Sequence, residues 1–381
     1  MIKNLVNLMR SMRSIIMRNA TRSSRVKSVA AGGFAVCNRR RKARGIVAGW
    51  LFSFLALEIA FGLALQGPLD CIRNPNYEKR QSLLRGMKEE IGDRPFVLLL
   101  GSSRIQQGVR PDIINHNPNL PFVYNFGCAG HGPRHHCIIL KRLLRDGIRS
   151  DCVVLELTPC QLIDPVAPVD VKNLLNHNYH ELQDSLPFRE RPDQIRDEWI
   201  RAQFLLPCFS HRYQLIALAL PAWNPPDSQP FQKRCPNDPY GWSPKERHGP
   251  PVPANEVRHR WAPVLADWHL DPMNRLAIEE IARVCQREQI GLTFVVMPEG
   301  PVFRSCYSAR AETALREFQN WLATFAGTTI VNAHEWLNDE DYYHDSHHIE
   351  PRAAELFTKL FVERLITLLP SSIKSQTVLR Q

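Results

Sequence analysis

A short, wholly apolar run that ends in small polar residues sets the strongest limit on the fold of this chain. Residues 96–100 read Phe-Val-Leu-Leu-Leu and are followed by Gly101, Ser102 and Ser103. Such a run suits a strand that is covered on both faces in a parallel sheet. Gly101 permits a sharp turn, so both serines are expected at the carboxyl end of the strand, where ligands gather in these sheets. An ordinary strand-to-helix turn with a serine cap has the same pattern.

Helical and strand patterns alternate from Asn76 onward, which predicts an α/β fold with a parallel sheet and helices on both of its faces. Strands are expected at 96–100, 122–126, 152–157, 292–297 and 328–332, and helices at 77–91, 134–146, 273–289, 309–325 and 351–368.

A proline-rich insertion separates the third and fourth expected strands. Residues 207–263 hold twelve of the 29 prolines, together with Trp223, Tyr240, Trp242 and Trp261. No regular element is expected to run far there. The insertion either packs over the sheet edge or the site, or is a surface excursion.

The amino terminus predicts a membrane anchor. Residues 1–44 form a basic arm, and residues 45–65 form an apolar run of the length needed to span a bilayer, with Glu58 as its single charge. Basic residues before the span and none close after it place the amino terminus in the cytoplasm and residues 67–381 outside. A cleaved signal peptide and a buried core helix are the alternatives.

Charge argues against a nucleic-acid-binding protein. The formal net charge is +10, but residues 1–44 contain twelve of the 48 Lys and Arg residues and no Asp or Glu. The remainder holds 36 basic residues against 38 acidic ones, so the globular part is not basic.

The ten cysteines contain no C-x-x-C pair, so zinc ribbons and thioredoxin-like sites are not expected. If the domain is exported, Cys208 and Cys235 are the first candidates for a disulfide.

Two further stretches contain chemistry-bearing residues. Residues 123–133 hold three glycines within six residues after an expected strand, which lets backbone amides approach a ligand, although a purely conformational role is equally compatible. Residues 341–351 contain Asp345 and His348, which are three apart in a turn before a helix, so that the carboxylate can hold the imidazole. A metal site and a solvated turn are alternatives there. No helical H-E-x-x-H pair supports a metal.

Taken in order, these three stretches resemble the SGNH/GDSL hydrolase superfamily, in particular its membrane-anchored bacterial envelope members. The resemblance covers about residues 94–160 and 290–368. It implies a flavodoxin-like three-layer α/β/α sandwich, with Ser103 of Gly101-Ser102-Ser103 as nucleophile and Asp345 and His348 as its partners. It further implies that the amides of Ser103 and Gly127 bind the oxyanion. Neither a metal nor an organic cofactor is implied.

One block departs from the family pattern. Its usual G-x-N-D, whose Asn side chain donates to the oxyanion, is replaced by Leu155-Glu-Leu-Thr-Pro159. Asn125 is a possible substitute donor. Glu156 is either a substrate contact or a buried carboxylate paired with an arginine.

The expected function is that of a serine esterase or O-acyltransferase acting on an ester of an envelope glycan or another acylated substrate. The alternative is a catalytically silent scaffold protein with the same fold, which the missing Asn favours. A nucleotide-binding protein is a third reading, but the sequence has no phosphate-loop motif.

Overall fold

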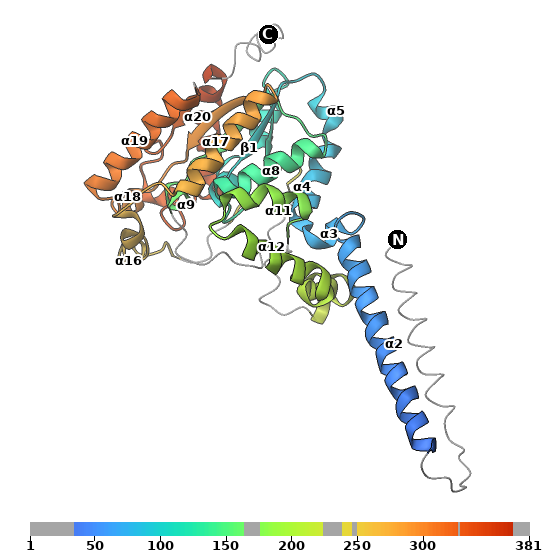
Figure 1. Cartoon of the computed structure of the whole chain (residues 1–381). Helices are drawn as coiled ribbons and strands as arrows, with labels where there is room; N and C mark the ends of the chain where they lie inside the picture. Colours follow the sequence, from blue (N-terminus) through green and yellow to red (C-terminus); the bar gives the residue numbers. More distant parts are fainter. Residues whose placement is uncertain (1–33, 164–175, 224–237, 246–249, 327, 369–381) are drawn as a thin grey trace. The chain divides into compact units, whose positions relative to one another are not determined.

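The structure is a computed structural model that describes residues 34–163, 176–223, 238–245, 250–326 and 328–368. The chain divides into two compact units, residues 1–57 and residues 58–381. The second unit contains the α/β domain (Figure 1).

A parallel sheet of five strands forms the centre of this unit. The strands are β1 (Phe96–Leu100), β2 (Phe122–Asn125), β3 (Cys152–Glu156), β4 (Gly291–Val296) and β5 (Thr329–Asn332), in the order β2-β1-β3-β4-β5. Every neighbouring pair is parallel. This is the strand order of a flavodoxin-like fold. The α/β prediction is confirmed, and each expected strand is present with ends within one residue of those predicted.

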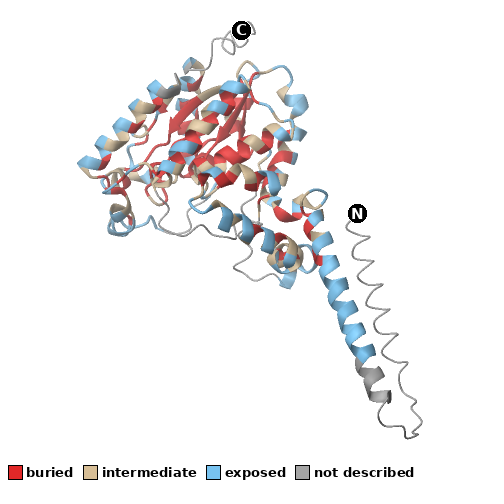
Figure 2. Ribbon diagram, in the orientation of Figure 1, coloured by how far each residue is buried: buried red, intermediate tan, exposed pale blue. Residues whose placement is uncertain are grey.

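Successive strand residues face opposite layers, as the pleat requires. In β1, Phe96, Leu98 and Leu100 pack into the core shared with α4 (Pro75–Gly86), α8 (Pro133–Arg145), α17 (Pro272–Arg287) and α19 (Ala309–Ala326). Val97 and Leu99 pack into the core shared with α6 (Ser103–Gly108), α7 (Pro111–Asn115) and α20 (Pro351–Leu368). Figure 2 shows the sheet buried between these two helical layers.

The predicted helix 77–91 is two elements. α4 ends at Gly86, and α5 (Lys88–Ile91) follows after Met87. Glycine is a poor residue for a helix interior, and the amide of Met87 already bonds back to Leu84 and Arg85. The remaining predicted helices start and end within two residues of the expected positions.

Short elements connect these layers. Before β1 lies α3 (Asp70–Arg73). Between β3 and β4 lie α9 (Pro159–Leu162), α11 (Tyr179–Ser185), η1 (Leu186–Phe188), α12 (Pro192–Ile200), the π-helical turn η2 (Arg201–Leu205), α13 (Pro207–Ser210), α14 (Arg212–Ala219), η3 (Pro221–Trp223) and α16 (Ala254–Leu265). After β4 follow α18 (Pro301–Arg304) and η5 (Glu340–Tyr342).

The expectation that no regular element runs far in the insertion is wrong for α16, a helix of twelve residues. Pro263 is inside this helix, which ends two residues later at Leu265, as expected for a residue that cannot donate its amide to the helix. The insertion also covers an edge of the sheet, as one of the two interpretations predicted. The Tyr240 carbonyl accepts from the Asn125 amide at 2.9 Å, and the Trp242 indole donates to the Gln107 carbonyl at 2.7 Å. Residues 224–237 and 246–249 lie outside the described part.

The apolar run is part of one long helix, α2 (Phe34–Ala64). Its residues 41–64 are long and apolar enough to cross a membrane, a property shared by membrane anchors and signal sequences. Large apolar side chains such as Trp50, Phe52 and Leu57 are exposed, which argues against a buried core helix. Glu58 belongs to the α/β unit and is buried.

Eight of the cysteines are free thiols, Cys208 included. Cys235 lies outside the described residues. The suggested pairing of Cys208 with Cys235 therefore stays a prediction.

Candidate active site

Ser103 is the first residue of α6, directly after the turn that ends β1. Its hydroxyl lies 2.7 Å from the Nε2 atom of His348. Gly101 is required at this turn, because a Cβ there would collide with Ile105 and with the Glu156 carboxylate. Ser103 is partly exposed, whereas Ser102 is buried.

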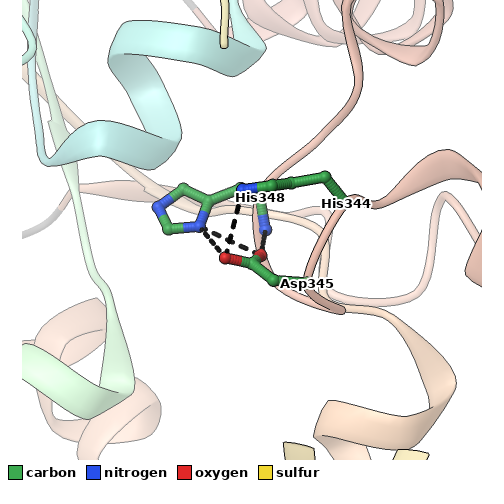
Figure 3. A group of neighbouring side chains, drawn as sticks. All are labelled: His344, Asp345 and His348. Carbon is green, nitrogen blue, oxygen red and sulfur yellow. Dashed lines mark hydrogen bonds and ion pairs between the residues drawn. The ribbon is translucent and has the colours of Figure 1, made fainter. Parts of the chain in front are cut away.

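His348 and Asp345 complete a hydrogen-bonded chain with Ser103. The Nδ1 atom of His348 lies 2.9 and 3.0 Å from the two carboxylate oxygens of Asp345, which also accepts from the His348 amide at 3.0 Å. Figure 3 shows this carboxylate between His344 and His348. The predicted geometry of Ser103, His348 and Asp345 is confirmed, and their catalytic role stays a prediction.

The loop that holds Asp345 and His348 is fixed by its neighbours. Ser346 has a φ of 66°, in the left-handed region that few non-glycine residues adopt. Its carbonyl accepts from the Gly300 amide at 2.7 Å, and its hydroxyl accepts from the Phe303 amide at 2.8 Å. These bonds hold the turn against α18 and so help to orient Asp345 and His348.

Asp345 is an anion surrounded by imidazoles. Burial would raise the pKa of Asp345, but the hydrogen bond from His348 and the charges of the nearby histidines outweigh burial and hold that pKa well below its usual range. His347 does not face Ser103. It packs against Phe303 and Trp261, and burial lowers its pKa to about 3.

Glu156 supports the serine turn instead of contacting a substrate or an arginine. It accepts from the Ser102 amide at 2.5 Å, from the Ser102 hydroxyl at 3.0 Å and from the Thr158 hydroxyl. Its side chain is buried, as one of the two interpretations predicted, but its hydrogen-bond partners among the described residues are an amide and two hydroxyls and include no arginine. The Ser102 hydroxyl is thus bound to Glu156, whereas the Ser103 hydroxyl is bound to His348.

The expected oxyanion donors of the second block are already engaged. The Gly127 amide donates to the Asn125 side-chain oxygen at 2.9 Å. The Asn125 side-chain nitrogen donates to the carbonyls of Ile105 and Val109 at 2.7 and 3.0 Å, and Asn125 is fully buried. The expected oxyanion roles of Gly127 and Asn125 are therefore not supported. Both residues join the loop after β2 to α6.

A buried ion pair next to Ser103 was not predicted. Arg104 follows Ser103, and its guanidinium bonds to Glu299 at 3.0 Å and to the carbonyls of Met297 and Pro298. Glu299 in turn bonds to His334 at 2.7 Å and to the Tyr307 hydroxyl at 3.1 Å. Glu299 lies just beyond β4, and a charged residue after an apolar strand was the available sequence signal.

The same loop has the donor set of a metal site. His344, Asp345 and His348 each offer one nitrogen or oxygen atom, and these atoms lie within 4.8 Å of one another. Imidazole and carboxylate are ligands that zinc accepts. His348 contacts Ser103 and Asp345 through its two ring nitrogens, so a bound metal would have to replace one of those contacts.

A separate cavity of about 110 Å³ lies between α4, α8 and α11, beside the glycine-rich loop. Its lining includes His131, His135 and His177, and none of Ser103, Asp345 and His348. Burial lowers the pKa of His177 to about 4, so this side chain is neutral at physiological pH.

Residues 69–184 match the model of a family described as a protein of unknown function, DUF1574. The matched segment contains Ser103 and the glycine-rich loop and ends before Asp345 and His348. No curated protein matches this chain.

Proposed function

We propose that this protein is a serine esterase or O-acyltransferase with an SGNH-hydrolase-like site. The observation that carries the proposal is the hydrogen-bonded chain of Ser103, His348 and Asp345. Three residues from opposite ends of the sequence meet with the spacing of a nucleophile, a base and an orienting carboxylate. The match to DUF1574 assigns no activity, so the proposal rests on this geometry.

In the first half of the reaction His348 Nε2 takes the proton of Ser103, whose oxygen attacks the ester carbonyl. The Asp345 carboxylate holds Nδ1 of His348 as a donor and stabilises the imidazolium. The tetrahedral adduct then expels the alcohol oxygen, which takes the proton from His348, and the acyl group stays on Ser103. Water or an acceptor hydroxyl repeats these steps in the second half and frees Ser103.

Stabilisation of the oxyanion falls mainly to the Ser103 amide. This amide occupies the first position of α6, where a helix offers it no internal acceptor. Loss of one oxyanion donor typically costs about 10²–10³ in rate, so we expect a slow enzyme. The same deficit supports the second candidate, a catalytically silent binding protein of envelope assembly.

We place the α/β unit outside the cytoplasm, on the evidence of the basic arm before α2 and the apolar length of that helix. An acylated envelope component, such as a glycan ester, is then the accessible substrate class.

Hydrolysis of a short-chain aryl ester by the purified full-length protein tests the proposal. We expect measurable activity that Ser103→Ala abolishes and that Ser102→Ala largely retains, provided that the variant folds. Zinc chelation should leave the rate unchanged. Absence of activity in the wild-type protein would favour the scaffold, and loss on chelation would favour a metal site at His344, Asp345 and His348.

A further inference from the structure

Eight large apolar side chains are exposed within the short segment 200–223, from the end of α12 to the end of η3. We call this set the apolar collar, and it consists of Ile200, Leu205, Leu206, Phe209, Tyr213, Leu218, Leu220 and Trp223. Phe209 and Trp223 are 62% and 74% exposed. Elsewhere in the described α/β unit, exposed large apolar residues are scattered along the sequence, and scattered residues of this kind need no explanation. A concentrated set marks an interaction surface.

The collar segment is joined to the carboxyl-terminal turns of α2. The Glu58 carboxylate accepts from the Cys208 amide at 3.0 Å. Gly62 touches the turn before α13 so closely that a Cβ would collide with the Gln203 carbonyl oxygen and press on the Phe204 ring. Both contacts lie within the α/β unit, so the collar and the end of α2 are parts of one packed structure.

Glu58 gains a partner from this arrangement. A carboxylate in a membrane-spanning helix is costly and needs a partner within the protein. Glu58 is 5% exposed, whereas Ile59 and Leu63 on the same two turns are 46% and 58% exposed. The charged group therefore faces the collar segment, and apolar groups of these turns remain open to the surroundings.

The side chains of the collar have the chemistry of a membrane interface. Tryptophan and tyrosine concentrate at the boundary between headgroups and acyl chains, where arginine extends toward the phosphates. In this segment, Arg212 lies over the rings of Phe209 and Tyr213, at 4.2 and 4.4 Å from their centroids. The helix whose last turns contact this segment is long and apolar enough over residues 41–64 to cross a membrane.

We propose that the apolar collar inserts into the interfacial layer of the lipid bilayer beside the end of α2. The collar is a second, monotopic membrane contact in addition to the helix. This inference requires that α2 remains attached as an anchor, and it is independent of the proposed esterase activity. Its consequence is that the α/β unit is held at the membrane surface instead of moving freely on a tether.

Tryptophan quenching in nanodiscs tests the collar on the full-length protein. Lipids brominated on their acyl chains should quench Trp223, so Trp223→Phe should lose part of the total quenching that the wild-type protein shows. Leu360→Trp supplies the matched control, because Leu360 is an exposed residue of α20, far along the chain from the collar. Its added emission should be unquenched. Equal fractional quenching in the wild type and in Trp223→Phe would overturn the proposal.

Photo-cross-linking separates lipid from protein as the occupant. A benzophenone amino acid at position 209 should attach to phospholipid in native membranes, whereas the same probe at position 360 should not. Attachment at position 209 to a second copy of the chain or to another protein, without lipid, would overturn the proposal. Recovery of the mature chain without α2 from the soluble fraction would do so as well.

Discussion

Two adjacent serines at the end of β1 have opposite environments. Ser102 is buried and bound to Glu156, whereas Ser103 is partly exposed and bound to His348. Successive residues at a strand end point to opposite sides, so only one of the two serines can face His348. Asp345 and His348 could be predicted as well, because their contact depends on a local turn. The groups that accept hydrogen bonds from Gly127 and Asn125 could not be predicted, since these contacts depend on how α6 packs against the loop after β2.

Substitution of Asp345 tests how this single residue acts on His348. Asp345→Asn keeps the shape of the side chain but removes the acceptor that holds Nδ1 of His348 as a donor, so the rate of Ser103 acylation should fall on the order of 10⁴-fold. Stopped-flow acylation with an activated ester measures that rate. Asp341→Asn, an exposed aspartate of the same loop, should leave it unchanged. Equal effects of the two substitutions would show that Asp345 has no special role in the site.

At the scale of elements, α6 is placed by a buried ion pair. Arg104 reaches Glu299 beyond β4, and Glu299 is fully buried. Burial would raise the pKa of Glu299, but Arg104 and His334 outweigh burial and lower it, so the carboxylate is charged. The expected strands and most helices could be read from apolar periodicity. The ion pair of Arg104 and Glu299 could not be predicted, because nothing in the sequence relates position 104 to position 299.

Glu299→Gln removes the charge and leaves the buried Arg104 without a counter-ion. We expect the free energy of unfolding to fall by about 3–5 kcal/mol, as measured by chemical denaturation. Asp193→Asn breaks an exposed pair with Arg196 and should cost under about 1 kcal/mol. A small effect of Glu299→Gln, similar to that of the control, would show that the ion pair does not hold α6.

Across the whole α/β unit, several histidines are buried in their neutral form. Burial lowers the pKa of His136, His177 and His211 to about 4 in each case. The unfolded chain binds protons at these histidines from about pH 6.5 downward, before the folded protein does. Their contribution to stability is therefore complete above pH 6.5 and is lost as the pH falls toward 4.

Chemical denaturation at pH 7.5, 6 and 5 measures this loss. A histidine whose pKa is shifted from about 6.5 to about 4 contributes at most about 3 kcal/mol to the free energy of unfolding. His211→Gln should flatten the decline between pH 7.5 and 5, whereas His269→Gln, at an exposed position, should leave the decline unchanged. A stability that is constant over this range would contradict the assignment of neutral buried histidines.

A reporter that is active only outside the cytoplasm tests the proposed membrane orientation. Fused after Gln381, it should be active, because the basic residues precede α2. Activity of a cytoplasmic reporter at the same position would show the opposite orientation and would rule out an envelope substrate.

Mapping of a fluorophosphonate adduct on the full-length protein tests the proposed nucleophile most directly. The probe needs an activated serine and does not depend on the identity of the acyl group. We predict one adduct, located on Ser103 by mass spectrometry of the digested protein and lost in His348→Ala. An unmodified Ser103 in folded wild-type protein, or an adduct on Ser102 instead, would contradict the proposed site.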